Sequence, residues 1–108
     1  MRIYAIGFLR RDISGARQPW DEIQIRSLAG RLGYNLRKII TFTNGADDVG
    51  LRLRNIVEDC HVDAVIVPSA AHFEGSVVPS KLVRVVDVIT VEPECTYAGR
   101  GYGARGLR

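Results

Sequence analysis

The feature that most constrains this chain is the alternation of two kinds of apolar pattern along it. Four segments read as β-strands, at about residues 3–9, 35–42, 62–67 and 86–91. The first is apolar almost throughout, as in a central strand covered on both faces, whereas the polar start of the second favours a position nearer the sheet edge. Strands that alternate with helices are typical of a parallel sheet. We therefore expect an open α/β fold with helices on both faces of a mainly parallel sheet of four or slightly more strands.

The segments between the strands carry helical spacing. Helices are expected over residues 19–32, from about Asp48 to Cys60, and over a short piece at 78–84. In the first, Pro19 suits a helix start, apolar residues recur at i, i+3, i+4 and i+7 from Ile25, and Gly33 ends the pattern. Asp47 or Asp48 is a plausible cap for the second helix.

The length and the charge distribution point to one domain with a short tail. The 108 residues are 46% hydrophobic and 25% charged, which is typical of one globular domain. We expect an α/β domain over residues 1–97 and a flexible Gly- and Arg-rich tail over 98–108. Residues 1–97 hold 12 basic and 12 acidic residues, so the net charge of +3 resides in Arg100, Arg105 and Arg108. The body is therefore not expected to be a basic nucleic-acid-binding module.

Further composition features concern location and cofactors. No apolar run approaches the roughly 20 residues of a membrane span, and the charged N-terminus does not resemble a secretory leader, so we expect a cytoplasmic protein without a membrane partner. Cys60 and Cys95 are interpreted as small buried residues rather than a disulfide, and their spacing predicts no metal site. The G-x-G-x-G of the tail precedes no helix, so no cofactor is predicted.

Candidate functional residues lie in the loops that follow the strands. In open parallel sheets, ligands bind beyond the carboxyl ends of the strands, which here lead into residues 10–18, 43–48 and 68–76. Arg10 and Asp12 are two residues apart, so they can form an ion pair at this edge. Arg10 is either a phosphate or carboxylate ligand or a solvated loop charge, and both interpretations stay open.

The third-strand loop and three serines supply the other candidates. His72 can act as a general base or a ligand, but no second ligand lies at metal spacing, and we interpret it as a partly exposed loop histidine. Ser14, Ser69 and Ser76 are nucleophile candidates only where a base is adjacent, and the sequence places none beside them.

The order of elements and two motifs resemble the catalytic domain of the serine recombinases, the resolvase and invertase family. Residues 62–69 read VDAVIVPS, where family members often read VDAVVVPS. The first helix is also similar to the family pattern through Gln24, Leu28 and the pair Gly33-Tyr34. The likeness covers about residues 3–91 and implies a resolvase-like fold.

The resemblance also implies that the catalytic residues of the family are missing. Asp12 stands where the family has its nucleophilic serine, Ala71 and His72 replace its acid–arginine pair, and Gly75 replaces a later arginine. Only Arg10 keeps the family identity. Without the nucleophile and two guanidinium groups, cleavage of a DNA phosphodiester by the family route is not expected. The resemblance thus implies a vestigial pocket formed by Arg10, Asp12, Ala71, His72 and Gly75.

Three functions follow as hypotheses. The leading one is a catalytically inactive, resolvase-like domain that acts, in a regulatory role, by association with itself or with another protein. The second is an accessory DNA-binding factor, with weak phosphate contacts from loop and tail arginines: Arg10, Arg11, Arg17, Arg100, Arg105 and Arg108. The third is an enzyme that acts on a small phosphorylated ligand through Asp12 and His72.

Overall fold

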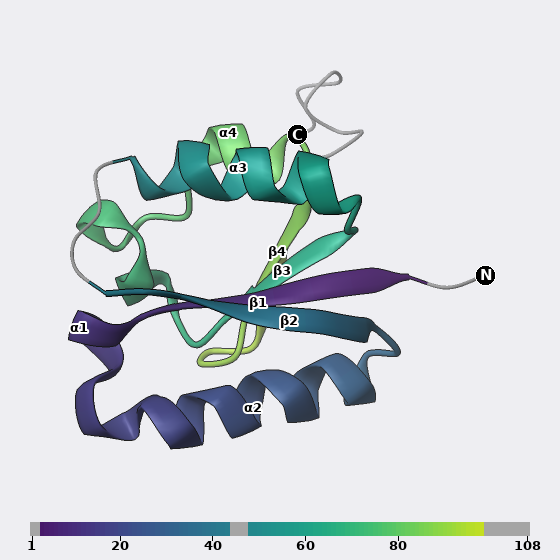
Figure 1. Ribbon diagram of the computed structural model, residues 1–108. Coiled ribbons are helices and arrows are strands. Elements are labelled where there is room, and N and C mark those ends of the chain that lie inside the picture. The colour runs from purple at the N-terminus through teal and green to yellow at the C-terminus, as the bar shows by residue number, and fades with distance from the viewer. Residues whose placement is uncertain (1–2, 44–47, 99–108) are drawn as a thin grey trace.

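The structure, a computed structural model, describes residues 3–43 and 48–98, and its centre is a five-stranded sheet (Figure 1). The strands are β1 (Tyr4–Arg10), β2 (Asn35–Phe42), β3 (Ala64–Val67), β4 (Asp87–Thr90) and β5 (Cys95–Tyr97). Their order is β2-β1-β3-β4-β5, and all neighbours run parallel except β5, which is antiparallel to β4. The prediction of an open, mainly parallel α/β sheet is confirmed, with β5 as a strand that the sequence pattern did not indicate.

Helices cover both faces of this sheet, as expected. The helical elements are α1 (Arg11–Ser14), η1 (Gly15–Arg17), α2 (Gln18–Arg31), α3 (Val49–Cys60), η2 (Ala70–His72), η3 (Glu74–Ser76) and α4 (Ser80–Val83). Helix α2 lies on one face, and α3 and α4 lie on the other (Figure 1). Among the described residues, no helix combines the length and the hydropathy that a membrane crossing requires.

The core has two layers because side chains alternate along the central strand. Ile6 and Phe8 of β1 pack in the layer beneath α3 and α4, whereas Ala5 and Leu9 pack in the layer against α2. Gly7 lies between Ala5 and Leu9 in the α2 layer, where an added Cβ would be 2.8 Å from Cγ2 of Ile25. The missing side chain lets α2 approach β1 closely. This contact fixes the middle of α2 against the middle of β1.

Three local predictions differ from the structure. The expected loop at residues 10–18 is helical, because α1, η1 and the first residue of α2 occupy it. Asp48 precedes α3, but its backbone is left-handed (φ 52°) and its side chain makes no capping hydrogen bond. Asp47 lies outside the described residues. Cys95 is exposed on β5 rather than buried, Cys60 is half-buried, and both are free thiols. The tail arginines also lie outside the described residues.

Candidate functional site

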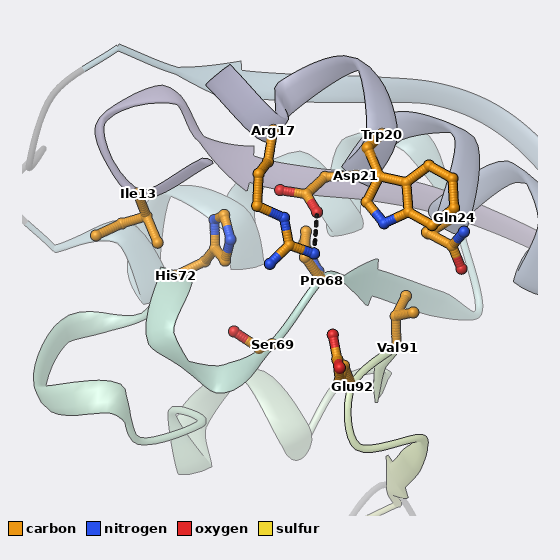
Figure 2. A pocket seen from close by; sticks show the side chains of 10 residues that line it. All are labelled: Ile13, Arg17, Trp20, Asp21, Gln24, Pro68, Ser69, His72, Val91 and Glu92. Carbon is orange, nitrogen blue, oxygen red and sulfur yellow. Dashed lines mark ion pairs between the residues drawn. The ribbon is translucent and has the colours of Figure 1, made fainter. Parts of the chain in front are cut away.

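A cleft lies at the carboxyl edge of the sheet, where the strand order reverses. The chain leaves β1 for β2 on one side and later enters β3 on the other side, so connections diverge between β1 and β3. The cleft has a volume of about 480 Å³, and α1, the start of α2, the segment after β3 and the turn after β4 line it (Figure 2). Its size and position are those of a small-ligand site.

The helical wall of the cleft is formed by Arg17, Trp20 and Asp21 (Figure 2). Asp21 is only 6% exposed, and one of its oxygens accepts a 2.7 Å hydrogen bond from the hydroxyl of Ser14. Its other oxygen is 3.7 Å from a guanidinium nitrogen of Arg17. As an acid in the first turn of α2, Asp21 also interacts favourably with the helix dipole. The Trp20 side chain remains 54% exposed beside these charges.

His72 enters the cleft from the segment after β3. The hydroxyl of Ser69 accepts a hydrogen bond from the amide of Ala71 at 3.3 Å, which caps the short helix η2 that carries His72. Nδ1 of His72 accepts a 2.9 Å hydrogen bond from the backbone N–H of Arg10. This bond fixes the neutral tautomer, with the proton on Nε2.

The environment of His72 keeps its ring neutral. Burial is the largest factor that lowers its pKa, and the charge of Arg10 acts in the same direction. The carboxylates of Asp21 and Asp12 oppose this shift without reversing it. The prediction of a partly exposed loop histidine is wrong, since the residue is 2% exposed. The pairing of β3 with β1 ends at Gly7. Helix η2 turns the His72 ring back onto the end of β1, beyond this pairing, where the ring accepts the N–H of Arg10.

Arg10 joins two members of the vestigial pocket. Its guanidinium donates to both oxygens of Asp12, at 3.1 Å from Nε and 2.5 Å from the terminal nitrogen, so the expected ion pair is confirmed. This hydrogen bonding is the largest cause that lowers the pKa of Asp12. Because its backbone amide binds His72, Arg10 holds Asp12 and His72 on the same side of the sheet edge.

The other two members of this pocket lie apart from these bonds. Ala71 is exposed next to His72, and Gly75 adopts φ 67° in η3, where an added Cβ would meet no atom within 4 Å. Of the five vestigial-pocket residues, only His72 lines the cleft. The structure therefore links Arg10, Asp12 and His72 by hydrogen bonds and does not bring Ala71 and Gly75 into this group.

The serine candidates are engaged elsewhere. Ser14 is buried and donates to Asp21, and Ser69 caps η2. Ser76 is exposed in η3. Within residues 3–43 and 48–98, no hydrogen bond joins a serine hydroxyl to a histidine ring, and no group of His, Cys, Asp and Glu is arranged to hold a metal ion.

Sequence reasoning named Arg17, Ser69 and His72 as candidates and missed the other residues that line the cleft, among them Trp20, Asp21 and Glu92. Trp20 and Asp21 were assigned only to a helix start, although Trp20 is the single tryptophan of the chain. Glu92 lies in the turn between β4 and β5, and the missing prediction of β5 left this turn unrecognised. For Trp20 and Asp21, the sequence did hold a signal: an aromatic residue lies next to charged residues in the segment that follows the first strand.

Comparison of the chain with protein-family models, with curated proteins and with solved structures finds no significant match. The resemblance to the serine recombinases therefore rests on the motif at residues 62–69 and on the order of elements. The function has to be inferred from the geometry of the site itself.

Proposed function

We propose that this chain is a catalytically inactive, resolvase-like domain that acts by association with a second copy of itself. The observation that carries the proposal is a group of exposed apolar side chains on α1 and α2. Ile13, Trp20 and Ile23 are 42%, 54% and 56% exposed, respectively. We call these three residues the apolar patch.

The apolar patch is adjacent to the cleft and separate from the core. Trp20 and Ile23 are three residues apart on α2, so they lie on the same side of this helix. The buried side of α2 uses other residues, among them Ile25 and Leu28. Ile13 and Trp20 both line the cleft, which brings α1 into the same surface. Exposed tryptophan and isoleucine side chains on one surface favour burial against a partner.

A second copy is the partner that fits the charges. Arg17 and Glu22 flank Trp20 in the sequence, so charges of both signs border the apolar patch. An isologous two-fold interface places each surface against its own copy, and unlike charges can then pair across the axis. Residues 1–97 also carry equal numbers of basic and acidic residues, 12 of each, so like-charge repulsion between two domains is small.

The contacts of the vestigial pocket support a binding role over catalysis. The guanidinium of Arg10 is held by Asp12, which occupies the position of the family nucleophile. The acceptor nitrogen of His72 is held by a backbone amide, so it is not free to take a proton from a substrate. These interactions stabilise the edge of the sheet and account for charged residues there without a reaction.

The DNA-binding alternative receives less support at this edge. Arg10 is paired with Asp12, and Arg17 lies near Asp21, so carboxylates partly neutralise two of the proposed phosphate ligands. The carboxylate of Glu92 also lines the cleft, where it would repel a phosphate. Arg11 is exposed, and Arg100, Arg105 and Arg108 lie outside the described residues.

Sedimentation velocity over a wide range of protein concentration tests the proposal. We expect a monomer–dimer equilibrium, and Trp20→Ala should weaken dimerisation by about 2 kcal/mol, as is typical of an interface hot spot. Val77→Ala is the matched control, because Val77 is an exposed apolar residue near α3 on the other face of the sheet. A wild-type protein that stays monomeric at the highest concentration would refute the proposal. An equal loss in the Val77 variant would refute the assignment of the interface.

A further inference from the structure

We propose that the cleft at the carboxyl edge binds a small organic cation, in which an ammonium or amidinium group is attached to a flat apolar body. This inference rests on the charge and lining of the cleft and concerns the monomer, because self-association through Ile13 and Trp20 would cover part of this lining.

The charge of the cleft is the first support. Two carboxylates line it, those of Asp21 and Glu92, and Arg17 is the one lining cation of the described residues. The Arg17 guanidinium is 3.7 Å from Asp21, so these two charges largely compensate each other. The carboxylate of Glu92 then has no counter-ion among the described residues that line the cleft.

Glu92 is available for a ligand. Its side chain is exposed and, in the described part of the chain, makes no hydrogen bond or ion pair. Figure 2 shows its carboxylate projecting into the cleft from the wall opposite α2. Glu94, two residues further along, differs because its carboxylate is 3.1 Å from the guanidinium of Arg31. A cationic ligand would provide the counter-ion that Glu92 lacks among the described residues.

The aromatic and apolar lining is the second support. Trp20 presents an indole that is 54% exposed, and Ile13 and Val91 add aliphatic surface around the same cleft. A flat apolar body can stack on the indole, and a cation near the face of tryptophan gains a further electrostatic attraction. The volume of about 480 Å³ accommodates a molecule of one or two rings.

The third support is a buried polar group at the floor of the cleft. His72 is 2% exposed, its Nδ1 accepts from Arg10, and its Nε2 makes no hydrogen bond among the described residues. The remaining Nε2–H can therefore donate to an acceptor atom of the ligand. A ring N–H that is free on the cleft side favours a ligand with an acceptor atom over a purely apolar one.

Three probes of similar shape and different charge test the inference: benzamidine, benzamide and benzoate. Trp20 is the only tryptophan, so its fluorescence reports binding in this cleft directly. In dilute protein at low salt, we expect benzamidine to change the fluorescence saturably, and the neutral and anionic probes to bind more weakly. Glu92→Gln should lower the affinity for benzamidine by about fivefold, the upper range for an exposed charge pair.

Glu94→Gln is the matched control and should bind benzamidine like the wild type. The inference is overturned if benzoate or benzamide binds as tightly as benzamidine, or if the fluorescence responds only linearly to all three. It is also overturned if Glu92→Gln binds like the wild type while circular dichroism shows that it is folded. Each of these outcomes leaves the sedimentation test of self-association unaffected.

Discussion

At the scale of single residues, Arg10 organises the edge of the sheet through two different parts of its structure. Its backbone amide donates to His72, and its guanidinium donates to Asp12. The first bond satisfies a backbone group at the end of β1, and the second neutralises a carboxylate beside it. A substitution of the Arg10 side chain would therefore release Asp12 but leave the bond to His72 in place.

Because His72 is buried as a neutral ring, we expect stability to depend on pH through this residue. Its pKa in the folded state is below its ordinary value near 6.5, mainly because of burial. The unfolded chain therefore binds the proton more readily, and the free energy of unfolding should fall as pH decreases from about 6.5 toward the lower folded pKa. Above about pH 6.5 the ring is neutral in both the folded and the unfolded state, so the protonation of His72 no longer lowers the free energy of unfolding.

Chemical denaturation at pH 7.5 and at lower pH, in wild type and in His72→Asn, measures this effect. The amide oxygen of asparagine can replace Nδ1 as the acceptor for Arg10 without titrating. The variant should thus lose part of the stability difference between the two pH values. His61→Asn is the control, since His61 is exposed and its left-handed backbone (φ 54°) suits asparagine. An unchanged pH dependence in the His72 variant would contradict the expectation.

The sequence predicted one of these residue contacts and missed the other for physical reasons. Arg10 and Asp12 are two residues apart at the end of a strand, where such side chains can point the same way, so their ion pair was predictable. The burial of His72 depends on the direction in which the three-residue helix η2 turns. Apolar periodicity carries no information over so short a segment, and the histidine was therefore expected to be exposed.

At the scale of elements, the turn between β4 and β5 is organised by one buried hydroxyl. The Thr90 side chain is 2% exposed, and its oxygen donates to the carbonyl of Pro93 at 2.6 Å. The carbonyl of Cys95 lies 3.5 Å from the same oxygen. This turn reverses the chain into β5 and places Glu92 at the cleft.

Thr90→Val should lower the free energy of unfolding by about 1–2 kcal/mol, because it keeps the shape of the side chain and leaves the carbonyl of Pro93 without its donor. Urea denaturation measures the change. Thr96→Val is the control at an exposed position of β5, and its effect should stay within about 0.5 kcal/mol. If the two variants are equally stable, the hydroxyl does not hold the turn.

Long elements were predictable from sequence and short ones were not. Strand β1 and helices α2 and α3 each carry enough apolar residues to show their period. Their observed bounds differ from the bounds expected from the sequence by only one or two residues. In contrast, α1 has four residues, η1 has three, and β5 has three that are all exposed. Their structure comes from contacts with neighbouring elements, which sequence pattern does not record.

At the scale of the whole molecule, charge is unevenly distributed between the folded body and the end of the chain. Residues 1–97 have no net charge, and the last residues carry three arginines without an acid. The core clusters lie entirely within residues 5–89. Fold stability and electrostatic attraction to polyanions are thus properties of different parts of the sequence.

Deletion of residues 99–108 should separate these two properties. It removes Arg100, Arg105 and Arg108 and takes the formal net charge from +3 to zero. We expect the full chain to retard duplex DNA weakly at low salt, through phosphate contacts that added salt abolishes, and the shortened chain not to retard it. The free energy of unfolding should be nearly unchanged, since every core residue of the described part of the chain is kept. Electrophoretic mobility shifts and urea denaturation measure the two effects.

A variant with lysine at all three arginine positions is the control for charge, and it should retard DNA like the full chain, because counterion release depends on charge rather than on the guanidinium group. Equal retardation by the shortened chain would place the DNA contacts on the body, where Arg11 and Arg17 are both exposed. Absence of retardation by the full chain at low salt would remove DNA as a partner. Self-association through the apolar patch on α1 and α2 would still be decided by sedimentation velocity.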